Sequence, residues 1–152
     1  MYKQIIIVRK DLNMSPGKLA AQVSHASMAF LSTAVKQNAL PMLDSEMKPT
    51  GKYSVMFEID ASIYEQWFQG TFTKLVLQAR NRSNLMKVTE MAQELGMTEG
   101  EDYFLIKDNC YTELTPEEVG EDGVGRTLTC IGFRPMDAEV IDQIGKKYHL
   151  YT

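Results

Sequence analysis

The stretch that decides the fold spans residues 5–18 and reads IIIVRKDLNMSPGK. Its first four residues, Ile5 to Val8, form an uninterrupted β-branched run, which is typical of a strand buried on both faces. Ser15 suits a helix N-cap and Pro16 the first helical position, so a helix is expected from Pro16 to the mid-thirties. A buried strand that leads into a long helix indicates the first unit of an α/β protein.

Strands and helices continue to alternate along the rest of the chain. Further strands are expected at 53–59, 74–78, 103–106 and 127–133, and helices at 61–68, 83–95 (capped by Ser83) and 136–144. Residues 36–52 resemble a connecting segment, 116–119 a turn of helix and 149–151 a short tail. This order predicts one domain, residues 1–152, with a three-layer α/β/α fold and a four-stranded mixed, mostly parallel sheet. The stretch 53–59 is a candidate extra strand within an insertion.

The composition is that of an ordinary globular protein, with 44% hydrophobic and 24% charged residues. No run approaches the roughly 18 apolar residues of a membrane-spanning helix, and the apolar block after the N-terminus is too short for a signal peptide. Cys110 and Cys130 are the two cysteines, and a chain of this length does not need a disulfide. We therefore expect a cytoplasmic protein with free thiols and no membrane association.

Charge is distributed unevenly around a net value of −4. Residues 1–36 carry five basic residues against one acid, and residues 66–89 carry four basic residues and no acid. Residues 90–122 carry eleven acids against Lys107 alone. Because an approaching anion responds to the local field, this distribution allows a basic face on an acidic molecule.

Two polar clusters are candidates for chemistry. Lys18, Gln22 and His25 follow at i, i+4 and i+7, which places them on one stripe of the expected helix. Asp108 directly follows the expected strand 103–106, where a carboxylate can act as a general base and Thr112 can help to position a water. The plain structural alternative is a solvated lysine, a buried histidine and a turn built on Asp108. Polar groups at the carboxyl ends of parallel strands nevertheless tend to converge.

Several common sites are absent from the sequence. Leu12 and Leu19 occupy positions at which a phosphate-binding P-loop needs glycine and Ser or Thr. No G-x-G-x-x-G motif follows a strand, so a dinucleotide site is not expected. Two lone cysteines and two distant histidines have no zinc-binding spacing. The sequence therefore predicts no cofactor and no metal.

Residues 5–14, followed by the run GKLAAQVSHA at 17–26, resemble the N-terminal signature of the type 2 peptidyl-tRNA hydrolases. The similarity covers most of the chain and continues at Trp67, Gly70, Lys74-Leu75-Val76-Leu77, Glu94-Leu95-Gly96, Asp108, Thr112, Pro116 and Gly132. The resemblance implies a three-layer fold with a four-stranded mixed sheet, often found as a homodimer. It also implies hydrolysis of the ester that joins a peptide to the 3′ end of tRNA, so tRNA is the expected partner.

The resemblance assigns roles to residues of both clusters. Asp108, aided by Thr112, would orient the attacking water, and Lys18 would stabilise the oxyanion or the leaving ribose oxygen. Gln22 would anchor the peptide or ribose end of the substrate, with His25 as a supporting residue behind these groups. The basic residues expected to contact tRNA phosphates are Lys74, Arg80 and Arg82.

The chain departs from the family pattern in the loop after Asp108. Residues 108–113 read DNCYTE, whereas the family's loop is closer to Asp-Ala-Gly-Arg-Thr-Gln, so one cation is lost and one anion gained. Residues 36–60 are also longer than the family's usual connection. Two alternatives therefore stay open on the same fold: a non-catalytic, protein-binding relative, and a hydrolase of another small ester or amide.

Overall fold

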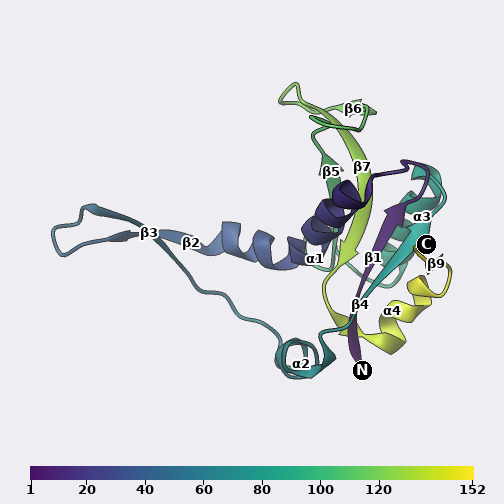
Figure 1. Ribbon diagram of the computed structural model, residues 1–152. Coiled ribbons are helices and arrows are strands. Elements are labelled where there is room, and N and C mark those ends of the chain that lie inside the picture. The colour runs from purple at the N-terminus through teal and green to yellow at the C-terminus, as the bar shows by residue number, and fades with distance from the viewer.

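A computed structural model describes all residues, 1–152, and places four long strands in one sheet (Figure 1). Strand β1 (Tyr2–Arg9) lies between β4 (Lys74–Ala79) and β7 (Gly125–Phe133), and β5 (Tyr103–Asp108) flanks β7. The short strand β9 (His149–Leu150) extends the other edge beyond β4. Two more short strands, β6 (Glu118–Val119) and β8 (Met136–Asp137), pair with β7 and β1. The mixed sheet built on four main strands is confirmed.

Fewer strand pairs are parallel than expected. Only β1 and β4 pair in parallel, whereas β7 runs antiparallel to both β1 and β5. The reason is that β7 follows β5 through a loop without a crossover helix, and such a connection joins antiparallel neighbours. Since β7 opposes both, β5 points in the same direction as β1. The carboxyl ends of β1, β4 and β5 therefore still meet at one edge of the sheet.

Helices cover both faces of the sheet, which confirms the three-layer arrangement (Figure 1). Helix α1 (Pro16–Asn38) packs on one face, and α3 (Arg82–Glu94) and α4 (Ala138–Gly145) pack on the other. The β-branched run divides its side chains between the two layers: Ile5 and Ile7 belong to the core under α3 and α4, and Ile6 and Val8 to the core under α1. This alternation explains why the strand has no polar face.

Helix α1 approaches the sheet closely at Gly132 of β7. A β-carbon at this position would lie 2.4 Å from the carbonyl oxygen of Ala26, so only glycine allows this packing distance. A polar contact fixes the same helix beside β1, because the buried Gln4 side chain donates to Ser27 O at 2.9 Å and accepts from Ser27 Oγ at 2.7 Å. The position of α1 over the sheet is therefore specified by both packing and hydrogen bonds.

The segment between α1 and β4 differs most from expectation. Helix α1 runs on to Asn38, and β2 (Ala39–Leu43) and β3 (Pro49–Val55) then form a two-stranded hairpin that stands away from the body (Figure 1). We call residues 39–55 the arm. The strand expected at 53–59 ends at Val55, so residues 56–59 were wrongly assigned. Residues 53–55 belong to β3, which pairs with β2 rather than with the main sheet. Prolines in the arm suggested a connection, but proline is compatible with an edge strand.

The expected helix at 61–68 forms as α2 (Ala61–Ile63), which continues into the π-helical turn η1 (Tyr64–Thr71) around the buried Trp67. Four smaller expectations are wrong. Residues 118–119 form β6 rather than helix, the cap of α3 is Asn81 rather than Ser83, and the tail contains β9. Residues 136–137 are strand β8, so α4 begins only at Ala138. None of the helices is long and apolar enough to span a bilayer.

Candidate active site

The first turn of α1 meets the end of β5 at the edge where the carboxyl ends of three strands gather. Lys18 Nζ lies 2.7 Å from Asp108 Oδ1 and 3.4 Å from Thr112 Oγ1. The Lys18 and Asp108 side chains are only 13% and 12% exposed. Ser15 caps α1, with its hydroxyl 3.4 Å from Lys18 N, so the predicted start of the helix is confirmed. Because the cap fixes the first turn of α1, it determines the direction in which the Lys18 side chain leaves the helix.

The Asp108 carboxylate is held by three donors. Oδ1 accepts from Lys18 and from Gln22 Nε2 at 3.2 Å, and Oδ2 accepts from Cys110 N at 2.9 Å. Cys110 has a φ of 60°, a left-handed conformation that favours glycine. The family's loop has glycine at this position. Cys110 adopts the same left-handed turn, which points its N–H toward Asp108. The structure thus brings together Lys18, Gln22, Asp108 and Thr112.

Gln22 is buried, and both ends of its amide group are in use. Its Oε1 accepts from Thr129 Oγ1 of β7 at 2.6 Å, while its Nε2 donates to Asp108. This geometry suits the orientation of Asp108 better than the anchoring of a substrate. Thr129 was not among the residues expected in the site. Its signal was a threonine in the buried part of β7, where Thr127 is buried as well, since a buried hydroxyl needs a partner.

The loop after Asp108 is tied to the N-terminus of α1. Glu113 Oε2 accepts from Ser15 N at 2.9 Å, and Glu113 Oε1 accepts from Ser15 Oγ at 2.6 Å. These hydrogen bonds to the charged form lower the pKa of the Glu113 carboxyl below its usual value. The anion that departs from the family pattern therefore caps the helix. It also holds the loop where Thr112 can reach Lys18.

His25 lies one turn beyond Gln22 and is exposed. It forms no hydrogen bond with Lys18, Gln22, Asp108 or Thr112. The helical stripe predicted from sequence is present, but only its first two members turn toward Asp108.

The acidic segment beside the site is largely paired with basic residues. Glu117 accepts from the buried Arg9, and Glu118 lies 2.9 Å from Lys107 Nζ and 3.4 Å from an Arg82 nitrogen. Further along the segment, Asp122 pairs with Arg126 at 2.6 Å. These ion pairs reduce the negative field that the sequence alone suggests next to the site.

The three basic residues expected to contact tRNA do not form one patch. Arg80 and Arg82 follow the end of β4, on the same edge as Asp108; Arg80 is exposed, whereas Arg82 contacts Glu118. Lys74 begins β4, about 20 Å away along the strand. Its ammonium lies 3.2 Å from the centre of the Phe72 ring, and desolvation there lowers the pKa of Lys74.

No group of three or more His, Cys, Asp or Glu side chains is placed to hold a metal ion. Both cysteines are free, and burial raises the pKa of the Cys130 thiol to about 12. The chemistry available in the cluster is therefore that of an ammonium, a carboxylate, a hydroxyl and an amide.

Comparisons with known proteins identify the family of the chain. The family model described as "Peptidyl-tRNA hydrolase PTH2" matches residues 2–151. A peptidyl-tRNA hydrolase of Methanopyrus kandleri is 34% identical, with 95% of this chain and 93% of the relative covered. One of Haloquadratum walsbyi is 31% identical, with 98% and 99% covered. One of Thermoplasma acidophilum is 28% identical, with 97% of each covered. The chain, matched over nearly its whole length, belongs to the PTH2 family of peptidyl-tRNA hydrolases.

Proposed function

We propose that Lys18, Gln22, Asp108 and Thr112 are the residues with which this chain hydrolyses the ester bond of peptidyl-tRNA. The observation that supports this most directly is the 2.7 Å contact between Lys18 Nζ and Asp108 Oδ1, with Thr112 Oγ1 3.4 Å from the same ammonium. A base, a cation and a hydroxyl converge at one edge of the sheet. The ester of an amino acid is already labile, so positioning and a modest polarising charge are sufficient.

In the first step, a water bound between Asp108 and Thr112 attacks the ester carbonyl. Asp108 accepts a proton from this water as the new C–O bond forms, and Thr112 holds the water in line. The carbonyl oxygen becomes an oxyanion, which the Lys18 ammonium stabilises. In the second step the tetrahedral intermediate breaks its bond to the ribose oxygen, which takes the proton from Asp108. The products are free tRNA and the released peptide.

Gln22 acts as a positioning residue in this scheme. Thr129 fixes one end of its amide, and its other end donates to Asp108, so rotation of the carboxylate is restricted. We assign His25 a supporting place on the same stripe of α1, without a part in proton transfer.

The tRNA contacts are proposed for two separate positions. Arg80 and Arg82 lie at the edge that carries Asp108 and are suited to phosphates near the reacting ester. Lys74 lies at the other end of β4, about 20 Å from Arg80 along the strand. This distance is within the length of a short RNA helix. A polyanion held at both positions binds less tightly as salt rises.

We further infer that the enzyme works in the cytoplasm, where translation supplies peptidyl-tRNA, and that it works as a homodimer. The two free cysteines are consistent with a reducing compartment. Support for the homodimer comes from the arm, whose strands are exposed and carry large apolar side chains such as those of Leu40 and Tyr53.

The catalytic assignment is tested by release of the acylated amino acid from an N-acyl-aminoacyl-tRNA. Lys18→Ala and Asp108→Asn should each lower kcat by about 100-fold or more, because each removes a charge that acts on the transition state. Lys87→Ala and Glu94→Gln are matched controls at exposed positions of α3 and should retain full activity. Equal rates above the uncatalysed rate for all of these variants and the wild type would discard the assignment. A wild type no faster than the uncatalysed reaction would favour a non-catalytic relative.

A further inference from the structure

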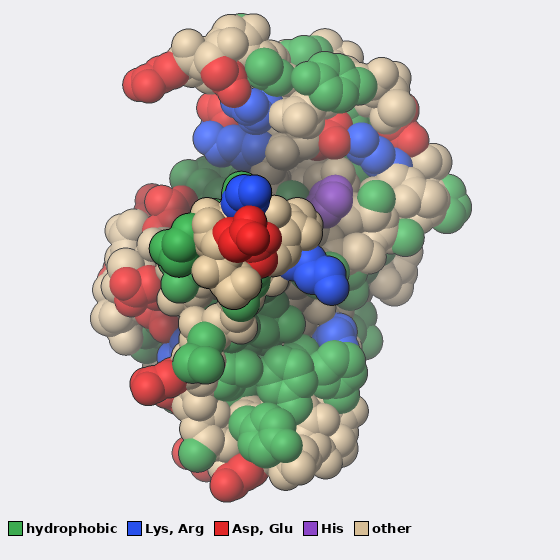
Figure 2. Space-filling view, turned by 90° about the vertical axis from the view of Figure 1, so that its left-hand side faces the viewer, with side chains coloured by type: hydrophobic (Ala, Val, Ile, Leu, Met, Phe, Trp, Pro, Cys, Tyr) green, Lys and Arg blue, Asp and Glu red, His purple; other side chains and the backbone are tan.

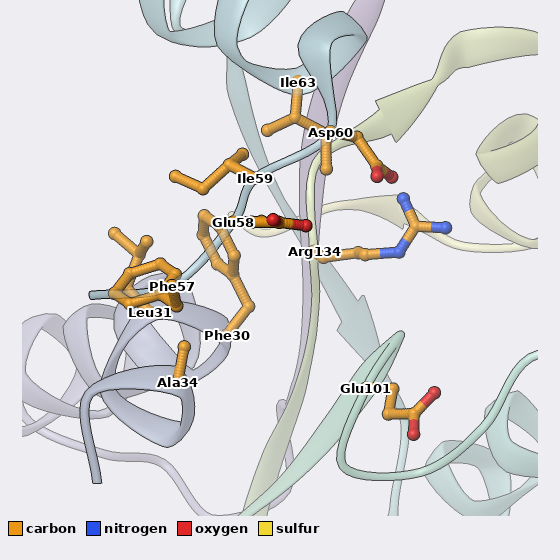
Figure 3. Close-up of a pocket in the computed structure, with 10 residues that line it drawn as sticks. All are labelled: Phe30, Leu31, Ala34, Phe57, Glu58, Ile59, Asp60, Ile63, Glu101 and Arg134. Atoms are coloured by element: carbon orange, nitrogen blue, oxygen red, sulfur yellow. The ribbon is translucent and has the colours of Figure 1, made fainter. Parts of the chain in front are cut away.

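Residues 56–60 connect the arm to α2 and enclose a hollow against the C-terminal half of α1 (Figure 3). These residues, here called the strap, have no regular secondary structure, and the hollow has a volume of about 180 Å³. Hydrophobic side chains gather on the surface beneath the arm (Figure 2). In the strap and η1, Met56 is 86% exposed and Tyr64 51%. No residue of the proposed active site lines the hollow, and Phe30 lies about 18 Å beyond Lys18 along α1.

One end of the hollow is an apolar wall. Phe30 and Leu31 of α1 and Phe57 of the strap gather there (Figure 3). The Phe30 ring packs edge-on against the buried Trp67, with 6.0 Å between the ring centres, so its position is fixed. All three wall residues are only partly buried and keep apolar surface in contact with water. A ligand that covers this surface is stabilised by its burial.

Two carboxylates without partners lie toward the other end of the hollow. They belong to Glu58 and Asp60 of the strap (Figure 3), and neither forms an ion pair within the chain. Asp60 occupies the N-cap position of α2, but its side chain makes no capping hydrogen bond. Aspartate at this position normally caps the helix. The Asp60 carboxylate is therefore free to bind a ligand.

The other charged residues of the lining leave the hollow with excess negative charge. Glu101 also lines the hollow and forms no ion pair. Arg134 is the one cation of the lining, and it pairs with Asp102 at 2.7 Å. Asp102 therefore offsets the charge of Arg134, and the three carboxylates of the lining remain uncompensated. This charge attracts a cation and disfavours a ligand with a carboxylate of its own.

We propose that the hollow binds a small amphipathic amine, a primary ammonium attached to one apolar group of about the size of a leucine side chain. The ammonium would lie between Glu58 and Asp60, and the apolar group would cover Phe30 and Phe57. Pockets for drug-sized ligands measure about 300–1,000 Å³. The smaller volume of this hollow favours a free molecule of amino-acid size over a segment of a protein. The proposal does not depend on the catalytic assignment, because the two sites share no residue.

An NMR titration of the isotope-labelled full chain with leucinamide tests the proposal. Leucinamide carries the ammonium and the apolar group but no carboxylate. It should shift the backbone amide signals of residues 30–34 and 57–63 saturably, with a Kd of about 1 mM, a value within reach of so small a ligand. The signals of Lys18 and Asp108 should stay in place. Absence of a saturable shift, or a saturable shift confined to other residues, would overturn the proposal.

Analogues separate the contributions of the charge and of the apolar group. N-acetyl-leucinamide has no ammonium, glycinamide has no apolar group, and leucine adds a carboxylate. Each should bind about threefold to tenfold more weakly than leucinamide, because each loses burial or charge complementarity. Leucyl-glycyl-glycinamide should bind no more tightly than leucinamide. Equal binding of N-acetyl-leucinamide would mean that the carboxylates do not select the ligand, and much tighter binding of the longer peptide would assign the hollow to a protein segment. Either result would overturn the proposal.

Variants of the lining locate the site. Glu58→Gln combined with Asp60→Asn should raise the Kd for leucinamide about threefold to tenfold, because both charges are lost while the shape is kept. Glu65→Gln is the matched control, since it removes an exposed acid of η1 outside the lining, and it should leave the Kd unchanged. Ala34→Phe should fill the hollow and abolish binding, with its thermal unfolding midpoint as the check that the chain still folds. A Kd unchanged in both altered linings would overturn the proposal. So would shifts at the lining that follow protein concentration without any amine, because they would assign the hollow to self-association.

Discussion

The Thr129 hydroxyl of β7 donates to Gln22 Oε1 of α1 at 2.6 Å, and both side chains are buried. This bond determines which end of the Gln22 amide faces Asp108, because an amide that accepts at one end donates at the other. The Gln22 nitrogen, 3.2 Å from Asp108 Oδ1, is thereby presented as a donor. A residue in the middle of the sheet thus controls the orientation of the proposed general base.

Replacing Thr129 with valine should impair catalysis without weakening substrate binding. Valine preserves the shape but leaves Gln22 Oε1 buried without a donor, which costs about 1–3 kcal/mol of stability. The amide can then turn, and Asp108 loses its orientation. We expect kcat to fall about 10-fold to 100-fold at unchanged KM. Thr129→Ser keeps the hydroxyl and should retain most of the activity, and a loss of activity equal to that of Thr129→Val would argue against the orienting role.

Sequence reasoning reached four residues of this site because motif spacing and topology agree there. The cap at Ser15 fixes Lys18 and Gln22 on one side of α1, and the strand directions bring Asp108 to the same edge. Thr129 was missed because its partner, Gln22, is 107 residues away in the sequence, so no local pattern predicts the contact. The role of Glu113 was not predicted for a related reason. Its charge was visible in the sequence, whereas its bonds to Ser15 depend on how the loop folds back.

Stability should depend on pH through Glu113. Its pKa is lowered in the folded state by the bonds from Ser15, so its contribution is complete above the usual pKa of about 4.5 and is lost as the pH falls through the lower folded value. Thermal unfolding of Glu113→Gln should lack this acid-side loss, because an amide does not titrate and can still bond to Ser15. Glu113→Ala should lower the unfolding temperature even at neutral pH. The same acid-side loss in wild type and Glu113→Gln would assign it to other carboxylates.

Gly132→Ala should displace or loosen α1. The added methyl group would lie 2.4 Å from the Ala26 carbonyl oxygen. Because this oxygen belongs to the backbone, only a shift of α1 or of β7 can relieve the contact. We expect a loss of about 1–3 kcal/mol, or several degrees in the unfolding temperature. Gly17→Ala is the matched control, since a β-carbon there meets nothing within 4 Å and reduces the freedom of the unfolded chain. A Gly132→Ala protein as stable as Gly17→Ala would mean that α1 is not seated as described.

The fold was predictable where residues bury their side chains and less so where they do not. The β-branched run at Ile5–Val8 and the Ser15-Pro16 cap have one stable outcome each, because burial and capping act locally. The arm lacks both constraints. Its exposed strands carry no core to fix their extent, so the pattern at 53–59 gave the wrong boundary. The number of parallel strand pairs was overestimated. The reason is that residues 109–124, which contain no helix, connect β5 to β7.

Binding of tRNA should respond oppositely to two substitutions at the carboxyl edge of the sheet. Arg80 is exposed and free of acids, so Arg80→Ala should weaken binding and reduce the slope of log K against log salt by about 0.7–0.9, the value for one phosphate contact. Glu118→Gln removes the carboxylate shared by Arg82 and Lys107, so both cations become available to phosphates and binding should tighten. Titration of labelled tRNA at several salt concentrations measures both effects, with Lys87→Ala as the control. Weaker binding by Glu118→Gln would mean that Glu118 holds Arg82 in its binding position rather than competing with the phosphate.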